Sequence, residues 1–205
     1  TSLFRLTSRS RILIHDNAYS DIIFDGRRGK SILSFEGAKE VCLEFYSLSK
    51  SYNYTGARMG FLVGNQYLVQ NFKKLRSQID YGPFLPVQYG AIAALLGPDD
   101  FIEKQCMEYQ RRRDALCGGF RSIGWEIPDS EGTMFAFGRI PEGFTDDVSF
   151  VTELLERSGV LCTPGSSFGS LGKGFVRFAL TLPVCQIKEA VKAVEECGIL
   201  SEKKE

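Results

Sequence analysis

The chain has 205 residues, and its 25 Lys plus Arg residues balance its 25 Asp plus Glu residues, so the formal net charge at pH 7 is zero. This neutrality gives no electrostatic reason to expect nucleic acid or an anionic membrane as a partner. The length allows one domain, or a domain and a half, with a sizeable core, and no run of about 18 apolar residues or hydrophobic signal segment indicates a membrane or exported protein.

The cysteines lie far apart in the sequence, without a Cys-x-x-Cys pair, and His15 is the only histidine. This distribution predicts reduced, mostly buried thiols in a cytoplasmic protein rather than a disulfide framework or a zinc site. We therefore expect no structural metal. The six cysteines are Cys42, Cys106, Cys117, Cys162, Cys185 and Cys197.

The hydrophobic pattern predicts strands that alternate with helices. Residues 1–10 resemble the tail of a helix, and the apolar run from Ile12 to Ile14 indicates a buried strand of a parallel sheet. The predicted strands, in chain order, cover residues 11–15, 41–45, 59–63, 133–137, 160–162 and 175–180. The predicted helices cover residues 67–79, 87–96, 99–122, 147–158 and 183–197. Such alternation is typical of the α/β class.

The long helix predicted from about residue 99 opens on Gly-Pro-Asp-Asp at 97–100, which is a helix-start signal. We expect this helix to connect a larger domain to a smaller one. Its three consecutive arginines, at 111–113, share the helix with acidic residues, so we predict a solvated face rather than a basic patch. Upstream, the two prolines within residues 81–86 are expected to keep that segment out of any helix.

Lys50 lies in a segment that is a poor core strand and a poor surface helix. Residues 47–53 read Ser-Leu-Ser-Lys-Ser-Tyr-Asn, and Arg58 follows within a Gly-containing turn at 55–60. A lysine that forms a Schiff base needs an amine that reaches a carbonyl, with hydroxyls and a guanidinium nearby to hold a phosphate. The alternative is a solvated lysine in a polar loop. Other segments of the chain are needed to distinguish a Schiff-base lysine from a solvated one.

Two other segments carry polar residues next to predicted strands. Asp16 and Tyr19 fall at and just past the carboxyl end of the first strand, where open α/β sheets bind ligands. Arg177 lies between apolar neighbours in the strand at 175–180, and a buried arginine is costly unless it meets a carboxylate.

These segments together resemble the C-terminal half of a fold-type I, class I/II aminotransferase, a family that uses pyridoxal 5′-phosphate (PLP). Residues 16–19, Asp-Asn-Ala-Tyr, match the family pattern Asp-x-Ala-Tyr, and residues 47–50 match Ser-x-Ser-Lys. Arg58 matches the phosphate arginine, and Arg177, in Gly-Phe-Val-Arg-Phe-Ala-Leu, matches the carboxylate-binding arginine. The likeness covers nearly the whole chain, and four motifs in the family order are far more specific than any one of them.

The resemblance implies an α/β fold in which residues 1–98 are the C-terminal part of the PLP-binding large domain, a mainly parallel sheet with flanking helices. Residues 99–123 are then the connecting helix, and residues 124–205 the small α/β C-terminal domain. A homodimer is expected, with small-molecule substrates. Family members are substantially longer, so we expect either a fragment or a chain complemented by another, with weak PLP binding by this polypeptide alone.

The resemblance also assigns catalytic roles. Lys50 forms a Schiff base with the PLP aldehyde and, once released, moves a proton; Asp16 keeps the pyridine nitrogen protonated; Tyr19 donates to the phenolic oxygen. The alternatives from the residues alone are an aspartate that caps a turn and an ordinary half-buried tyrosine.

Three further residues are implied to hold the phosphate: Ser47, Ser49 and Arg58. The Ser49 hydroxyl could instead satisfy only backbone groups. Arg177 is implied to bind the α-carboxylate of the substrate through two hydrogen bonds, with a structural ion pair as the alternative. Residues 131–135 and 163–169 place glycine beside an aromatic residue, which suits either a pocket wall or simple turns.

The function implied is transfer of an amino group from an α-amino acid to a 2-oxo acid. A PLP-dependent carbon–sulfur β-lyase uses the same residues, and a non-catalytic aminotransferase-like effector module can retain them, so both remain alternatives. Residues 81–85 contain no basic side chain to bind a distal carboxylate, which disfavours a specialist for dicarboxylic substrates.

Overall fold

The computed structural model describes residues 12–98 and 100–201. They form two compact units, Thr1–Gln105 and Cys106–Glu205, here called the first and the second unit. The division falls within the helix α6 (Asp100–Ser122), and the domain limits given above stay a prediction. The expected helix tail at 1–10 lies outside the described residues. Across the described ranges, no helix combines the length and the apolar character that crossing a membrane requires.

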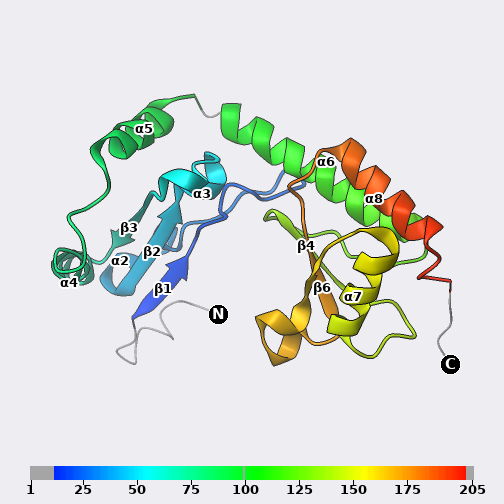
Figure 1. The fold of residues 1–205 in the computed structure, drawn as a ribbon. Coiled ribbons are helices and arrows are strands. Elements are labelled where there is room, and N and C mark those ends of the chain that lie inside the picture. Colours follow the sequence, from blue (N-terminus) through cyan, green and yellow to red (C-terminus); the bar gives the residue numbers. More distant parts are fainter. Residues whose placement is uncertain (1–11, 99, 202–205) are drawn as a thin grey trace. The chain divides into compact units, whose positions relative to one another are not determined.

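The first unit contains a three-stranded sheet in the order β1-β2-β3 (Figure 1). Its strands are β1 (Leu13–Asp16), β2 (Cys42–Ser47) and β3 (Gly60–Gly64). β1 and β2 are parallel, as the apolar run predicts, whereas β2 and β3 are antiparallel. The expectation of a mainly parallel sheet is thus met by one of these two strand pairs. Residues 48–59, which include α3 (Leu48–Ser51) and η2 (Thr55–Ala57), connect β2 to β3 and reverse the direction of the chain.

β1 is less buried than the sequence suggests. Ile12 is 58% exposed and Ile14 is 60% exposed, so the prediction of a strand buried on both faces is wrong for these two side chains. Their side chains lie on a face that the described residues of the first unit leave largely uncovered.

The helices of the first unit are α2 (Ala38–Val41), α3 (Leu48–Ser51), α4 (Gln66–Arg76) and α5 (Leu85–Leu96), with 3-10 turns η1 (Ile32–Ser34) and η2 (Thr55–Ala57). α4 and α5 occupy two of the predicted helical ranges. Asn65 caps α4, since its side-chain oxygen accepts a hydrogen bond from the N–H of Leu68 at 3.0 Å. Pro86 belongs to the first turn of α5, where no backbone N–H is needed; the prediction that both prolines stay outside a helix is therefore wrong for Pro86.

The second unit contains an antiparallel sheet in the order β4-β6-β5. Its strands are β4 (Phe135–Arg139), β5 (Thr163–Pro164) and β6 (Phe175–Ala179). Its helices beyond α6 are α7 (Asp147–Ser158) and α8 (Val184–Glu196). Its 3-10 turns are η3 (Gly165–Phe168) and η4 (Ser170–Gly172). Asp146 caps α7 by accepting the N–H of Ser149 at 2.7 Å, and Gly159 ends it with a left-handed backbone.

One face of this second sheet forms the core of the unit. Side chains from β4, β6, α6, α7 and α8 meet around Trp125, which is 2% exposed and donates its indole N–H to the carbonyl of Arg139 at 2.7 Å. Residues alternate along each strand, so the opposite face carries a different set. That face presents Phe135, Phe137, Arg139, Phe175 and Arg177.

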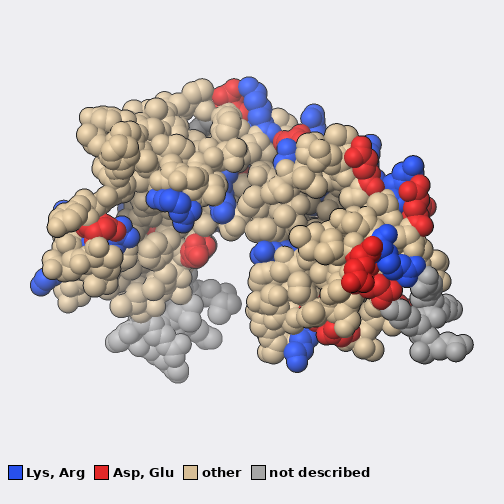
Figure 2. Space-filling view, viewed as in Figure 1, with Lys and Arg blue, Asp and Glu red and all other residues tan. Residues whose placement is uncertain are grey.

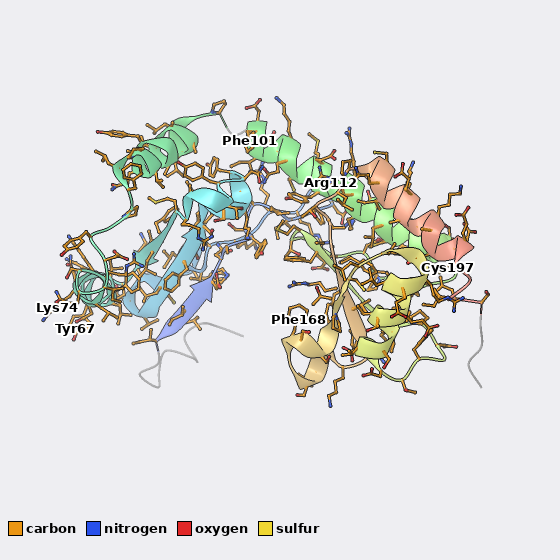
Figure 3. The ribbon with its side chains drawn as sticks, viewed as in Figure 1. Tyr67, Lys74, Phe101, Arg112, Phe168 and Cys197 are labelled. Atoms are coloured by element: carbon orange, nitrogen blue, oxygen red, sulfur yellow. The ribbon has the colours of Figure 1, made fainter. Side chains whose placement is uncertain are left out.

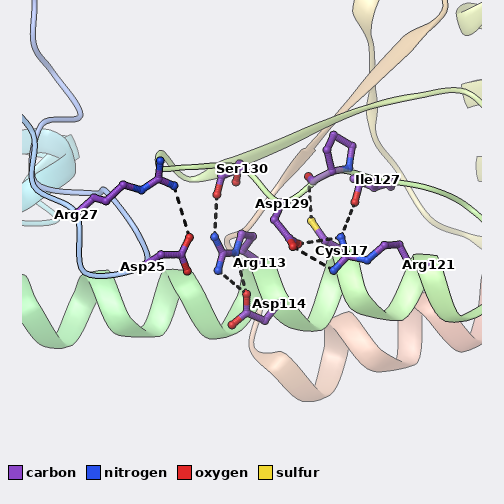
Figure 4. Close-up of polar contacts among 10 residues, drawn as sticks. Asp25, Arg27, Arg113, Asp114, Cys117, Arg121, Ile127, Asp129 and Ser130 are labelled. Carbon is purple, nitrogen blue, oxygen red and sulfur yellow. Dashed lines mark hydrogen bonds and ion pairs between the residues drawn. The ribbon is translucent and has the colours of Figure 1, made fainter.

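The arginine run at 111–113 is not a uniformly solvated face. The prediction is wrong for Arg113, which is 4% exposed and pairs with Asp114, while its guanidinium also donates to the carbonyl of Ser130 at 3.0 Å (Figure 4). Arg112 donates to the carbonyls of Leu180 and Thr181. Both bonds satisfy backbone oxygens that the sheet does not use. The face visible in Figure 2 carries both signs of charge interspersed, in keeping with the balanced composition.

None of the six cysteines forms a disulfide, and all six lie within the described ranges. Burial raises the pKa of Cys117 to about 11 and that of Cys162 to about 12. Thiols with such pKa values stay protonated near neutral pH and behave as small apolar side chains.

Candidate active site

The parallel pairing of β1 and β2 brings the predicted residues of the first unit to one edge of its sheet. Asp16 is the last residue of β1, and Ser47 is the last residue of β2. Because carboxyl ends of parallel strands meet at the same edge, Asp16 and the segment after Ser47 are neighbours. The N–H of Asn17 donates to the carbonyl of Phe45 at 2.9 Å, which continues the pairing one residue beyond Asp16.

Lys50 lies one turn beyond this edge, in α3. Its Nζ is 5.6 Å from the centre of the Tyr19 ring, and its side chain is half-buried. No carboxylate among residues 12–98 and 100–105 forms an ion pair with this amine. The sheet therefore brings Tyr19 and Lys50 together from segments about thirty residues apart, and the amine is available for a ligand.

Hydrogen bonds and burial anchor the short helix α3 that carries the lysine. The hydroxyl of Ser47 accepts a hydrogen bond from the N–H of Ser49 at 3.2 Å, Leu48 is fully buried, and Ser49 is 6% exposed. The carbonyl of Ser49 accepts from the hydroxyl of Thr55 at 2.9 Å. These bonds connect the lysine helix to the turn that follows it.

Two contacts of this helix were not anticipated from the sequence. Gln105, in α6, donates its side-chain amide to the carbonyls of Lys50 at 2.5 Å and Ser51 at 3.3 Å. The buried hydroxyl of Ser51 is hydrogen-bonded to the hydroxyl of Tyr46 at 2.9 Å, and Tyr46 also donates to the carboxylate of Asp21. The Gln105 amide satisfies carbonyls at the C-terminal end of α3, which its short length leaves without intrahelical partners. The bond from Tyr46 satisfies the buried Ser51 hydroxyl.

Arg58 follows the η2 turn in a left-handed backbone conformation, with φ 55° and ψ 46°. This conformation is uncommon for a residue other than glycine and is often found at ligand sites. Its guanidinium donates to the carbonyl of Thr55 at 3.3 Å, and the side chain is exposed. Gly60 follows, and a Cβ there would lie 2.7 Å from the carbonyl oxygen of Tyr46, so the turn approaches β2 too closely for any larger residue.

Asp16 is exposed at the end of β1. Its carboxylate forms no ion pair and no side-chain hydrogen bond within the described part of the first unit. The alternative of an aspartate that caps a turn is therefore not seen, and the acceptor oxygens are open to a ligand.

A buried glutamate beneath this edge was also not anticipated. Glu44, in the central strand β2, is 5% exposed. Its carboxylate accepts four hydrogen bonds, from the side chains of His15 at 3.0 Å, Asn17 at 3.1 Å and Ser31 at 2.9 Å and from the N–H of Ile32 at 2.7 Å. Burial acts to raise the pKa of Glu44, but these bonds outweigh it, and the pKa is lower than the ordinary value. Glu44 thus fixes the residues on either side of Asp16.

We expect Glu44→Gln to lower the free energy of unfolding of the first unit by about 2 kcal/mol or more, since it removes charge-assisted bonds and turns an amide donor toward other donors. Because the folded pKa is depressed, this contribution is fully present above the unfolded pKa of about 4.3 and is lost as pH falls through the folded pKa. Hydrogen exchange of β1 and β2 amides at pH 7 and at lower pH measures it. Glu40→Gln, on an exposed side chain of α2, is the control; equal protection in both variants at pH 7 would contradict the assignment.

Arg177, in β6 of the second unit, is half-buried between two aromatic rings. Its Cζ lies 4.1 Å from the centre of the Phe135 ring and 4.2 Å from that of Phe168. Within the described part of this unit no carboxylate pairs with it, so the alternative of a structural ion pair is not seen there. Both loops considered as pocket walls contribute a ring to this contact, Phe135 from 131–135 and Phe168 from 163–169.

A surface cavity of about 900 Å³ in the second unit involves none of the predicted residues. It lies near Trp125, Arg139, Pro141 and Phe175. All of its lining residues belong to the second unit.

Residues 2–194 match the family model described as aminotransferase class I and II, so the chain belongs to this family, whose enzymes use PLP. It is 42% identical over 188 residues to LL-diaminopimelate aminotransferase of Halothermothrix orenii, covering 92% of this chain and 48% of that protein. It is 45% identical over 177 residues to the enzyme of the same name from Dehalococcoides mccartyi, and this match covers 86% of this chain and 45% of that protein. The chain thus spans about half the length of the curated relatives it matches.

Solved structures give the same result. An aminotransferase from Staphylococcus aureus is 33% identical and superposes with a TM-score of 0.90, covering 98% of this chain and 53% of that one. The resemblance found in the sequence motifs is therefore confirmed at the level of the family. The names of these relatives give no support to the carbon–sulfur lyase alternative.

Proposed function

We propose that this chain is the lysine-bearing part of a PLP-dependent aminotransferase, which moves an amino group from an α-amino acid to a 2-oxo acid. The observation that carries the proposal is the Lys50 amine lying 5.6 Å from the centre of the Tyr19 ring, beyond the carboxyl edge of β1 and β2 where Asp16 ends β1. Family membership supports the same class of reaction.

The donor set at this edge fits PLP. Within the described residues of the first unit, neither the half-buried amine of Lys50 nor the exposed carboxylate of Asp16 has an ion-pair partner. The amine suits the PLP aldehyde, and the carboxylate suits its ring nitrogen. When bound, the cofactor supplies an electron sink for the bonds at the substrate Cα. In the proposed reaction the carboxylate of Asp16 holds a proton on that nitrogen, the Tyr19 hydroxyl donates to the phenolic oxygen, and the Lys50 amine carries a proton to and from the substrate carbon.

Three side chains near α3 are proposed to hold the phosphate. Ser47 and Ser49 lie at the start of this helix, and Arg58 is exposed on the turn after it. The Ser47 hydroxyl accepts one backbone N–H and still has a proton to donate. Arg58 supplies charge and a planar set of donors that a lysine would not supply.

The family pattern supports assigning the chain to the C-terminal half of the enzyme, since the lysine and the two arginine motifs follow one another in the family order. We further propose a cytoplasmic homodimer. The support for the dimer is α5, an apolar helix with exposed side chains on several sides: Leu85 is 56% exposed, Tyr89 64%, Ile92 50% and Leu96 82%. Monomers rarely leave such an apolar surface in water.

The proposed amino donor is LL-diaminopimelate, because the relatives at 42% and 45% identity carry that name. Arg177 is proposed to bind the α-carboxylate. This donor has a second, distal carboxylate, contrary to the expectation drawn from the absence of basic residues in 81–85. We propose that groups outside that segment bind the distal end.

The test is a transamination assay of the complete protein that contains this chain, with PLP, LL-diaminopimelate and 2-oxoglutarate. We expect glutamate to form, and pyruvate and ammonia not to form from cystathionine. An absence of amino transfer with every α-amino acid offered would contradict the proposed class of reaction, whereas transfer from other donors alone would contradict only the proposed donor.

A further inference from the structure

The guanidinium of Arg177 lies between two phenyl rings that come from separate segments. Phe135 belongs to β4, next to β6 in the sheet, while Phe168 is the last residue of η3. Phe168 stands on this turn at the surface of the second unit (Figure 3) and is 50% exposed. The ring therefore contributes less to the core than a fully buried one would, and it contacts the guanidinium of Arg177.

Stacking of this kind restrains a guanidinium without using its hydrogen-bond donors. The rings attract the cation through their faces at 4.1 and 4.2 Å. The N–H groups point outward in the plane of the guanidinium, so its edge remains available. In the described residues of this unit no carboxylate occupies that edge, which has the shape to receive a carboxylate through two parallel hydrogen bonds.

The turn that carries Phe168 is itself fixed. The N–H of Ser166 donates at 2.7 Å to the carboxylate of Asp147, which is 3% exposed. Burial acts to raise the pKa of Asp147, but hydrogen bonds from Ser166 outweigh it and the pKa is lowered, so the anchor stays ionised. Gly165 and Gly172 touch so closely that a Cβ on Gly165 would overlap the carbonyl oxygen of Gly172. The position of the ring is therefore built into the turn.

We propose that Phe168 is a positioning residue, which holds the Arg177 guanidinium against Phe135 in the one orientation that binds the α-carboxylate of the substrate. This inference rests on the proposed function, in which Arg177 binds that carboxylate. Without the ring the long arginine side chain samples several rotamers, and ordering it costs part of the binding free energy. The effect belongs to binding, not to the chemical step.

The test compares Phe168→Leu with the parent in the complete, PLP-loaded protein. We expect KM for an α-amino acid substrate to rise about threefold to tenfold, with kcat changed less than about twofold. The inhibition constant of pentanoate, an unreactive carboxylate, is expected to rise by the same factor, and that of the neutral pentanamide to stay unchanged. Phe168→Tyr keeps a ring and is expected to behave as the parent.

The matched control is Phe101→Leu. Phe101 has the same side chain and a similar exposure of 48%, but it belongs to α6 and not to the sheet face that carries Arg177; parental constants are expected. Unchanged pentanoate inhibition in Phe168→Leu, or equal weakening of pentanoate and pentanamide, would overturn the inference. If the parent itself transfers no amino group, the proposed function fails, and direct calorimetry of pentanoate against pentanamide still decides the role of Phe168.

Discussion

Lys50→Ala is expected to lower kcat of the complete protein by at least about 10³-fold, because a positioned general base alone contributes roughly 10²- to 10⁴-fold and the variant also loses the covalent link to PLP. The site around Lys50 offers no substitute amine at this edge within the described part of the first unit. The measurement is the steady-state rate with the best amino donor at saturating PLP.

The control for this variant is Lys39→Ala, which removes an exposed amine from α2 of the same unit and is expected to leave kcat within about twofold. Adding a small primary amine, such as ethylamine, to Lys50→Ala is expected to restore part of the rate, because a free amine can carry the proton. A rate for Lys50→Ala equal to that of Lys39→Ala would remove Lys50 from the reaction.

Asp16→Asn is expected to lower kcat by about 10²-fold or more, since it keeps the shape of the side chain but removes the charge that holds a proton on the ring nitrogen. Asp16 is exposed at a strand end and forms no ion pair within the described residues of its unit, so its replacement should cost little stability. Thermal unfolding of the variant checks this second expectation.

Asp16→Glu retains the charge one methylene further out and is expected to keep more activity than Asp16→Asn. The control Glu36→Gln neutralises an exposed carboxylate in the same unit and is expected to behave as the parent. If Asp16→Asn and Asp16→Glu were equally impaired, shape rather than charge would matter at this position, and the assigned role would be wrong.

The part of the fold that positions the site was predictable because local patterns determine it. The apolar run before Asp16 predicts a parallel strand, and the pairing of β1 with β2 confirms it. The reversal from β2 to β3 was not predictable, because an apolar stretch does not reveal the direction of its neighbour. The prediction for Pro86 was wrong for a similar reason. Proline breaks the interior of a helix but suits its first turn, and the sequence does not show at which residue the helix begins.

The candidate site divides in the same way. Lys50, Asp16, Tyr19 and Arg58 lie in short motifs, which a sequence displays directly. Gln105 reaches Lys50 across 55 residues, and nothing in its local sequence marks it. The sequence around Glu44 does contain a signal, because a charged residue stands inside an apolar strand. Such a residue indicates a buried carboxylate that surrounding donors satisfy, as the N–H of Ile32 does here.

The account depends most directly on where PLP is attached. The complete protein, loaded with PLP, is treated with sodium borohydride, digested and analysed by mass spectrometry. We predict that the reduced cofactor is found on the peptide that contains Lys50 and that Lys50→Ala incorporates none. Reduced cofactor on a different lysine of the parent protein, or undiminished incorporation into Lys50→Ala, would contradict the assignment of the site.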